Sequence, residues 1–266
     1  MASDKWGLDG KTAIVTGGGT GLGRAISLAL AKAGADIAIA AIPVTLKEMN
    51  ETSAEIKQLG RNSIVISVDI ADSQQVNAMV ARTIEEMGKV DILVNNAGMV
   101  EREAKPIWEI SDEEWHKVMD VNLSGTFFCC RAVAKHMTER KQGRIINIAS
   151  IAGMRGLRNN FMYCSSKAGI ISLTQVLALS WTELGIKVNA IAPAFFATWR
   201  SPEEYEAVAR FIPVGRVGKP EEIGPLAVYL SSDASDYVTG QVFCIDGGTS
   251  AGGYAPTGYI PVIVGG

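Results

Sequence analysis

Seven short apolar runs recur along the 266-residue chain, and longer amphipathic stretches separate them. The runs are nearly continuous in apolar residues rather than alternating, which is typical of strands covered on both faces. They are TAIVT from Thr12, DIAIAA from Asp36, SIVISVD from Ser63, DILVN from Asp91, RIINIAS from Arg144, KVNAIAP from Lys187 and QVFCIDG from Gln241. The stretches between them predict helices over Leu22–Ala33, Leu46–Leu59, Ser73–Met87, Asp112–Thr138, Met162–Leu184 and Pro220–Leu230. This alternation predicts right-handed crossovers and an α/β fold with a doubly wound, seven-stranded parallel sheet.

The domain organisation follows from the same pattern. No linker rich in Pro, Gly or Ser interrupts the chain before residue 247, and a chain with 47% apolar residues can bury a large core. We therefore expect one domain over residues 1–266. The last twenty residues, 247–266, form a Gly-rich tail that either docks on a neighbouring subunit or is a loose end.

Charge and composition exclude several classes of function. The net charge is −3 and no run of Lys or Arg resembles a nucleic-acid patch, so we expect no nucleic-acid partner. No apolar segment approaches the roughly 20 residues of a membrane span, and the start of the chain is too polar for a signal peptide. Four cysteines and two histidines show no metal-ligand spacing. A cytoplasmic protein without a metal site is the expectation.

A glycine-rich turn follows the first apolar run directly. The stretch TGGGTGLGRAISLALAKAG begins at Thr16 and leads into an amphipathic helix. Glycines let the backbone turn tightly, and the first helical N–H groups then face outward with the helix dipole behind them. After a strand and before a helix, this pattern predicts a pyrophosphate site in a Rossmann-type fold. The candidate residues are Gly17, Thr20, Gly21, Leu22 and Gly23.

A possible proton-transfer pair lies in the stretch NFMYCSSKAGI, where Tyr163 precedes Lys167 by four residues. On a helix this spacing puts both side chains on one face. A phenol with its ordinary pKa near 10 is a poor base at neutral pH, and lowering the pKa to about 7 takes roughly 4 kcal/mol. A buried ammonium can supply this energy. Ser150, at the end of a predicted strand, can converge with Tyr163 on one substrate oxygen and hold it by a hydrogen bond.

The glycine spacing T-G-x-x-x-G-x-G resembles that of the short-chain dehydrogenase/reductase family, and the resemblance extends from about Lys11 to Gly248. It includes NNAG at Asn95–Gly98, Asn122 in VNLSGTFF, the Ser150, Tyr163 and Lys167 set, Pro193–Thr198, and DGG at Asp246–Gly248. The family implies an NAD(P)-dependent oxidoreductase that interconverts a secondary alcohol and a ketone by hydride transfer. It also implies catalytic roles for Asn122, Ser150, Tyr163 and Lys167, with Asn122 holding a water that links Lys167 to solvent.

The resemblance also implies cofactor contacts beyond the glycine-rich turn. Asp69 and Ile70 would meet the adenine, Asn96 the adenosine ribose region, and Phe196 and Thr198 the nicotinamide carboxamide. Gly98, Tyr163 and Lys167 are further cofactor-binding candidates. At the end of the second predicted strand, Ala41 stands where family members often carry Asp, and Ile42 stands where NADP users often carry Arg. The nearest cation is Lys47, inside the next predicted helix. Without a phosphate partner we favour NAD over NADP. Ala194 replaces the glycine that usually follows this proline in the family. A side chain there narrows the backbone freedom, so the loop after Pro193 need not have the family's geometry.

Two segments are expected to line the substrate site: the residues between Ser150 and Tyr163, and a mobile lid over about 194–216. Arginines there recognise anions by a bidentate fork, whereas aromatic and Met side chains suggest an apolar wall. The arginine candidates are Arg102, Arg155, Arg158 and Arg200, and the apolar candidates are Phe161, Met162, Phe195, Phe196 and Trp199.

Within the family the chain looks most like the branch acting on sugar acids and polyols, which favours a small polyol, hydroxy acid or sugar acid as substrate. A 3-oxoacyl carrier-protein reductase is the alternative within enzymes, although it would favour NADP and a basic docking surface. A catalytically silent nucleotide-sensing protein is the alternative from another class. The resemblance further implies a homotetramer or homodimer.

Overall fold

The computed structural model of this chain describes residues 5–100, 105–198 and 201–251. All seven strands are parallel and form one sheet in the order β3-β2-β1-β4-β5-β6-β7. The strands are β1 (Thr12–Thr16), β2 (Asp36–Ala41), β3 (Ser63–Ser67), β4 (Ile92–Asn95), β5 (Gly143–Ile148), β6 (Ile186–Pro193) and β7 (Val242–Ile245). The predicted doubly wound sheet is confirmed. β3 ends two residues earlier than predicted, so that Asp69 lies in the turn after it.

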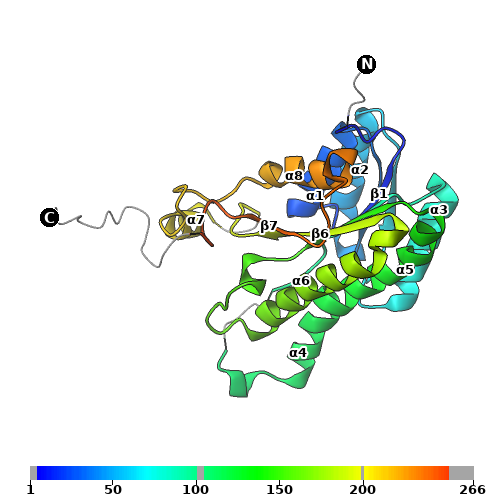
Figure 1. Ribbon diagram of the computed structural model, residues 1–266. Helices are drawn as coiled ribbons and strands as arrows, with labels where there is room; N and C mark the ends of the chain where they lie inside the picture. The colour runs from blue at the N-terminus through cyan, green and yellow to red at the C-terminus, as the bar shows by residue number, and fades with distance from the viewer. Residues whose placement is uncertain (1–4, 101–104, 199–200, 252–266) are drawn as a thin grey trace.

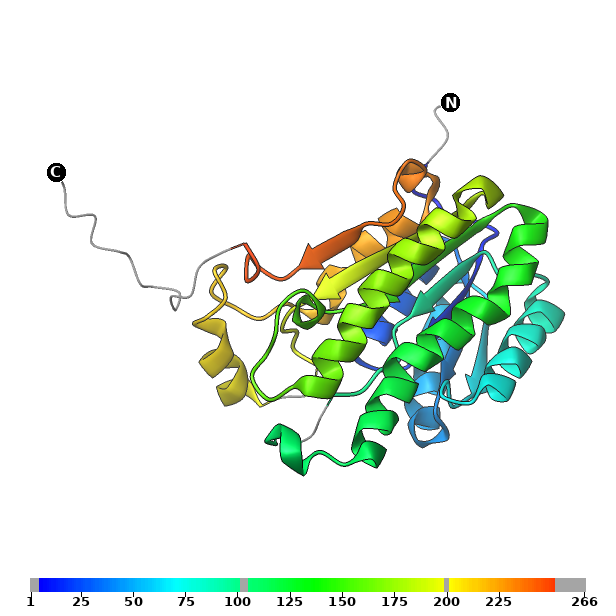
Figure 2. The ribbon, with the colours of Figure 1, turned by 60° about the horizontal axis from the view of Figure 1, so that its bottom comes forward.

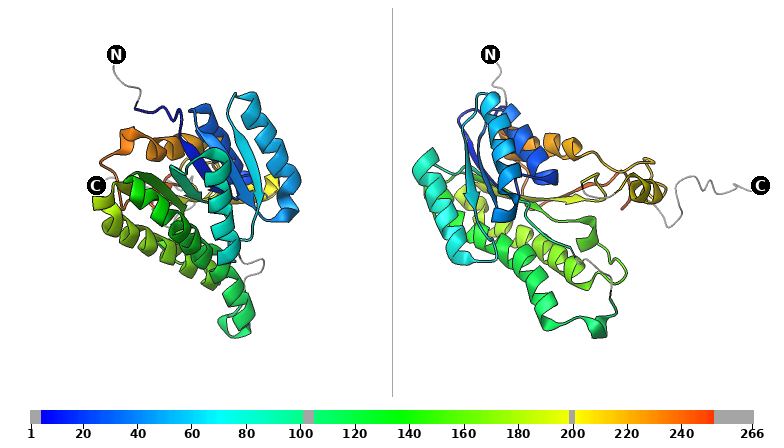
Figure 3. Two further views of the ribbon diagram at one scale, coloured as in Figure 1. Left: turned by 90° about the vertical axis from the view of Figure 1, so that its right-hand side faces the viewer. Right: turned by 180° about the vertical axis from the view of Figure 1, so that it is seen from behind.

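Helices cover both faces of the sheet (Figure 1). They are α1 (Gly21–Lys32), α2 (Leu46–Gln58), α3 (Ser73–Met87), α4 (Asp112–Met119), α5 (Gly125–Arg140), α6 (Phe161–Trp181), α7 (Pro202–Ala209) and α8 (Gly224–Ser231). The helices α1, α2 and α8 pack on one face, and α3, α5 and α6 on the other, as the two views of Figure 3 show. None of the helices among the described residues has the length and apolarity needed to cross a bilayer.

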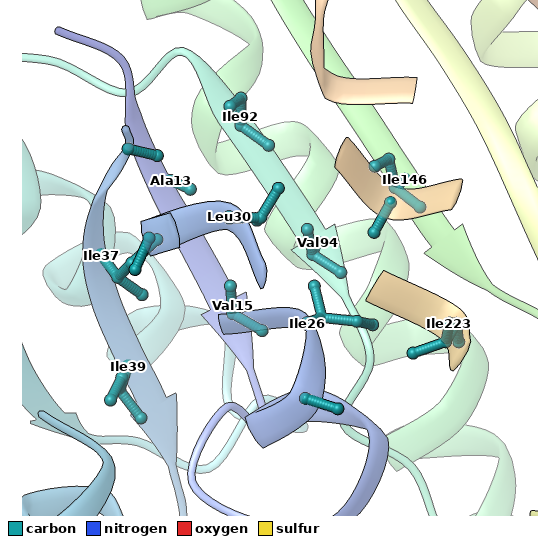
Figure 4. Close-up of a cluster of buried hydrophobic side chains, with 14 of the residues drawn as sticks. Ala13, Val15, Ile26, Leu30, Ile37, Ile39, Ile92, Val94, Ile146 and Ile223 are labelled. Atoms are coloured by element: carbon teal, nitrogen blue, oxygen red, sulfur yellow. The ribbon is translucent and has the colours of Figure 1, made fainter. Parts of the chain in front are cut away.

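The core on the α1 side shows why the apolar runs are continuous. Val15 of β1 and Val94 of β4 lie beside Ile26 of α1, Ile39 of β2 belongs to the same cluster, and all four side chains are fully buried (Figure 4). The residues that alternate with them point to the other face, where Ile14 and Leu93 join a second cluster with α3 and α5. Both faces of each central strand are therefore dry, as expected for a parallel sheet.

The strand order reverses between β1 and β4, because the chain winds outward from β1 to β3 and then returns to the other side. Ligands of open α/β sheets bind in the crevice beyond the carboxyl ends of the strands at such a point. In Figure 2 the arrowheads of β6 and β7 lie at the same end of the molecule as the start of α6 and the short helix α7. The fold therefore gathers the predicted site residues at one edge.

Two local features differ from the sequence prediction. The helix expected over Asp112–Thr138 is present and extends to Arg140, but a π-helical turn over Asp120–Ser124 lies between α4 and α5. The segment expected as a lid contains α7, which begins after Ser201 with a capping box between Ser201 and Glu204. Main-chain hydrogen bonds from Ala197 to Gly218 and from Gly218 to Phe195 join the two ends of this segment.

Candidate active site

The glycine-rich turn places the amino end of α1 at the carboxyl edge of the sheet. Gly17 and Gly21 have φ values of +64° and +52°, in the left-handed region that favours glycine. A Cβ atom on Gly23 would collide with the carbonyl oxygen of Gly17, so this turn accepts no side chain there. Thr20 at the N-cap makes no side-chain hydrogen bond to the helix, and the first turn has no acidic residue. Since no protein carboxylate or hydroxyl caps α1, its N–H groups and dipole suit an external anion.

A polar tie holds this turn against the end of β4. The hydroxyl of Thr16 accepts hydrogen bonds from the backbone N–H groups of Asn96 (2.9 Å) and Ala97 (3.0 Å). The side-chain amide of Asn96 donates to the carbonyl of Thr16 at 2.9 Å and to that of Gly17 at 3.4 Å. Asn96 thus fixes the turn while it also faces the crevice. Asn96 and Gly98 both line the cavity, and their contact with a cofactor stays a prediction.

A cavity of about 890 Å³ opens along this edge. Its volume lies within the range of sites that hold a cofactor or drug-sized ligand. One end is formed by the turn after β1 and the other by the loop after β5 and the start of α6. Its lining includes the predicted residues Gly17, Thr20, Gly21, Leu22, Asn96, Gly98, Ser150, Arg155, Tyr163, Lys167, Phe196 and Thr198. Gly23 lies beneath the turn rather than at the surface of the cavity.

Lys167 is the buried cation of this cavity. Its side chain is 4% exposed, and its Nζ lies 5.6 Å from the centre of the Tyr163 ring. The ammonium donates a hydrogen bond of 2.8 Å to the carbonyl of Ile148 at the end of β5. Burial lowers the pKa of Lys167 from 10.5 to about 8, so it is still mainly charged at neutral pH. The one-turn spacing in the sequence therefore does place an ammonium beneath the phenol ring.

Ser150 lines the same cavity. It follows β5, is 7% exposed, and its hydroxyl accepts a hydrogen bond from the N–H of Ala152 (3.1 Å). The sequence alone permits a purely structural N-cap role, and the structure shows that capping bond. The hydroxyl also lies at the wall of the cavity, together with Tyr163 and Lys167. The hydroxyl donates to the carbonyl of Pro193 over a long distance of 3.5 Å. Both roles are compatible, because a proton in so long a bond can turn to a substrate oxygen while the hydroxyl still accepts from Ala152.

Asn122 lies in the π-helical turn and is fully buried. Its Oδ1 accepts from the N–H of Met99 at 2.8 Å, and its Nδ2 donates to the carbonyl of Met99 at 2.9 Å. The irregular turn widens the helix at this point, and π turns often occur at functional sites. Asn122 does not line the cavity itself. It lies directly behind Gly98, where an added Cβ would be 3.1 Å from its Oδ1.

Several predicted residues lie elsewhere. Asp69 is exposed in the turn after β3, where its carboxylate accepts from the N–H of Ala71, and Ile70 is buried against Gly125. Neither lines the cavity, so their adenine contact stays a prediction. Arg158 is exposed and also lies outside the lining. Phe161 and Met162 are likewise absent from the lining. Met162 is buried. Arg102, Trp199 and Arg200 lie outside the described residues.

Part of the cavity wall lies in the two segments expected to line the substrate site, although these residues were not named individually: Ile151, Ala152, Leu157 and Asn160 before α6, and Ala194, Tyr205 and Val208 in the predicted lid. The sequence interpretation missed the lining residues outside those segments: Ala97, Met99 and Val100 after β4, Ile148 and Ala149 at the end of β5, and Pro193 at the end of β6. Tyr205 could have been named, because S-P-E-E at 201–204 is a capping-box signature that predicts a helix. The loop residues carry no comparable signal. Ala194 fits without strain, since the non-glycine residues with positive φ in the described ranges are Lys141 and Asn159.

The residues present fit a dinucleotide. The uncapped amino end of α1 matches a pyrophosphate, and the cavity extends from there to the buried Lys167 and Tyr163. Among the described residues no group of three or more His, Cys, Asp or Glu side chains could hold a metal ion. The arrangement can bind a phosphate-bearing cofactor at one end and move a proton at the other.

Comparisons with known proteins agree with this geometry. A family model described as enoyl-(acyl carrier protein) reductase matches residues 17–250. The chain is 39% identical to 2-dehydro-3-deoxy-D-gluconate 5-dehydrogenase of Escherichia coli strain K12, over 93% of this chain and 98% of that protein. It is 37% identical to a 3-oxoacyl-[acyl-carrier-protein] reductase of Synechocystis, over 91% and 97% of the two chains. The crystal structure of a short-chain type dehydrogenase/reductase from Mycobacterium marinum is similar with a TM-score of 0.87 at 34% identity, covering 94% of this chain and 99% of that one.

Proposed function

This chain belongs to the short-chain dehydrogenase/reductase family and is an NAD(P)-dependent oxidoreductase, and from that premise we propose its reaction and its residues. It interconverts a secondary alcohol and a ketone on a small polar or anionic polyol, hydroxy acid or sugar acid. Asn122, Ser150, Tyr163 and Lys167 carry the chemistry. The observation that supports this most is the buried ammonium of Lys167 beneath the Tyr163 ring, in a cavity that also holds Ser150.

The bound nicotinamide would supply or accept the hydride, and the protein moves the proton. In the oxidative direction, the phenolate of Tyr163 takes the proton of the substrate hydroxyl. Lys167 favours that phenolate because its ammonium is held 5.6 Å from the ring centre in a site shielded from water. The Ser150 hydroxyl donates to the substrate oxygen and fixes its position. In the reductive direction the same groups return the proton.

NAD is the favoured cofactor. Ala41 at the end of β2 is buried, and Ile42 beyond it is half exposed, so this edge has neither a carboxylate for a ribose hydroxyl nor an arginine for a 2′-phosphate. Arg24 of α1 binds the carboxylate of Glu55 at 2.7 Å, and Lys47 of α2 is exposed and lies 4.0 Å from the carboxylate of Glu51. Comparison of kcat/KM for NAD and NADP tests this, and a strong preference for NADP would contradict it.

Arg155 is the arginine that supports an anionic substrate. It lines the cavity, and its Nη1 donates to the carbonyl of Thr249 at 3.1 Å, which holds the side chain at the cavity mouth. The relative that oxidises a sugar acid also supports this class. A panel of sugar acids and neutral polyols, followed by cofactor absorbance, tests the proposal. Arg155→Ala raises KM for the acids at least fivefold and leaves KM for neutral polyols unchanged. Arg158→Ala is the matched control. Equal effects of the two variants on KM would contradict a role of Arg155 in binding an anionic substrate.

A carrier-protein reductase is the second candidate. The similarity to a 3-oxoacyl-[acyl-carrier-protein] reductase supports it, as do Met99, Leu157 and Phe195, which make part of the cavity wall apolar. The net charge of −3 is unfavourable for an acidic carrier. Reduction of a 3-oxoacyl thioester faster than any polar ketone would favour this candidate.

A homotetramer or homodimer is supported by the exposed apolar surface of α5 and α6. Phe127, Val176 and Leu179 are 42%, 55% and 83% exposed. A helix as apolar as α6 normally has no free face, which suggests a second copy on this one. We place the protein in the cytoplasm, since all four cysteines are free thiols. Light scattering tests the assembly: Leu179→Glu gives a smaller particle than the native chain, and a native monomer would contradict it.

A further inference from the structure

Ser166 lies between two members of the proposed catalytic set. It is fully buried on α6, one residue before Lys167. Its hydroxyl donates a hydrogen bond of 2.8 Å to the carbonyl of Tyr163 and accepts one of 3.0 Å from the Nδ2 of Asn122. A serine within a helix often bonds back to a carbonyl in the preceding turn, which needs no further explanation. The bond from Asn122 is different, because it comes from the π-helical turn between α4 and α5.

The contacts of Asn122 show what this bond does. Both N–H groups of its amide are used, one for Met99 and one for Ser166, and its Oδ1 accepts from the N–H of Met99. Ser166 is therefore the side-chain partner that fixes the rotation of the amide, and the remaining partners are the backbone of Met99. Without Ser166 one buried N–H would lack a partner, and such groups tend to reorient.

The amide oxygen of Asn122 and the ammonium of Lys167 face the same small space. A Cβ atom on Gly98 would lie 3.1 Å from the Oδ1 of Asn122 and 3.5 Å from the Nζ of Lys167. The negative end of the amide dipole is thus directed toward the region of the buried ammonium. In a site from which water is largely excluded, such a dipole stabilises the charged form of the lysine.

We propose that Ser166 is a positioning residue: it fixes the amide of Asn122 against the space next to Lys167 and thereby supports the ammonium that activates Tyr163. This inference rests on the proposed function, because it requires Tyr163 to be the proton-transfer group. Ser166 does not touch the substrate. It acts through Asn122, and its influence on the reaction therefore depends on that residue.

The test begins with Ser166→Ala and with Ser165→Ala as the matched control, because Ser165 is exposed on the same turn of α6. We expect Ser166→Ala to lower kcat about tenfold, within the range for an unpaired buried donor. KM and the dissociation constant of the cofactor change less than twofold. The lower limb of the kcat/KM profile for alcohol oxidation moves to higher pH by about one unit, since a weaker ammonium makes the phenol less acidic. Ser165→Ala behaves as the native enzyme.

A double-mutant cycle with Asn122→Ala separates positioning from general packing. If Ser166 acts through Asn122, Ser166→Ala has less than a twofold further effect on kcat in the Asn122→Ala background. An equal tenfold loss in both backgrounds would overturn the inference, as would a Ser166→Ala enzyme with native kcat and an unchanged pH profile. Ser166→Cys keeps the volume with a weaker hydrogen-bonding group. It carries the same test if the alanine variant does not fold.

Failure of this inference can be told from failure of the proposed function by including Tyr163→Phe. If Tyr163→Phe retains turnover, the proposed function itself is wrong. If Tyr163→Phe is inactive while Ser166→Ala equals the native enzyme in kcat and in pH profile, the role of Ser166 alone is wrong.

Discussion

Replacement of Lys167 by Met removes the ammonium and keeps a side chain of similar length in a site that is only 4% exposed. The ammonium lies 5.6 Å from the centre of the Tyr163 ring. At an effective dielectric constant of about 20, a unit charge at this distance is worth about 3 kcal/mol to a phenolate. That energy corresponds to about two pKa units of the phenol, or a factor of about 100 in the fraction ionised at neutral pH.

The assay is kcat/KM for alcohol oxidation between pH 6 and 10 at saturating cofactor. At pH 7 we expect Lys167→Met to lose about 100-fold. The gap narrows as the pH rises, because the phenol of the variant ionises and because native Lys167, with its pKa near 8, loses its own charge. Cofactor affinity measured by fluorescence separates this effect from lost binding. A loss below threefold, or a large loss that is equal at pH 7 and pH 10, would refute the electrostatic reasoning.

Lys167→Met is expected to raise the stability of the fold at pH 7, although it lowers activity. Burial lowers the pKa of Lys167 from 10.5 to about 8, so the folded chain binds fewer protons than the unfolded chain between these values. Charging the buried lysine therefore costs the native protein about 3 kcal/mol at pH 7, and this cost disappears as the pH rises to about 10.5. Lys167→Met is expected to be more stable to urea at pH 7 than the native enzyme, and about equally stable near pH 10.5. Equal stability at both pH values would show that the lysine is not penalised by burial.

Two further predictions concern the frame of the site. Gly23→Ala places a methyl group against the carbonyl of Gly17, so calorimetry should show cofactor binding weakened at least 100-fold; native affinity would contradict the tight turn. Asp91→Ala should lower the free energy of unfolding by about 3–5 kcal/mol, because it leaves Arg140 and the N–H of Thr12 without their buried carboxylate partner. Burial alone would raise the pKa of Asp91, but Arg140, Thr12 and Lys89 outweigh it and hold the pKa below its usual value. The contribution of Asp91 to stability is thus present above about pH 4 and lost in acid. The ion pair between Arg144 and the exposed Asp236 contributes less than about 1 kcal/mol.

The sheet and the phosphate turn could be predicted because each has a local cause. Ile14, Leu93 and Ile146 belong to runs that are nearly continuous in apolar residues, and such runs are typical of strands with two dry faces. The one-turn spacing of Tyr163 and Lys167 likewise fixes their shared face on α6.

The π turn between α4 and α5 is not marked in the sequence. The stretch DVNLSG from Asp120 to Gly125 consists mostly of weak helix formers, but it contains no proline and the chain remains helical through it. A π turn differs from an α-helix only in which carbonyl each N–H reaches, so no residue type predicts it. The two arginines of the loop after β5 were equally ambiguous. Arg155 faces the cavity and Arg158 faces solvent, because an irregular loop has no period that would assign a direction to either.

Turnover by Tyr163→Phe, with cofactor affinity measured on the same sample, tests the account most directly. Phenylalanine keeps the ring over Lys167 and removes the hydroxyl that would carry the proton. The account predicts that turnover falls at least 1000-fold, within the range of general acid–base catalysis, while the dissociation constant of the cofactor stays within about threefold. A variant that still turns over within tenfold of the native rate would contradict it.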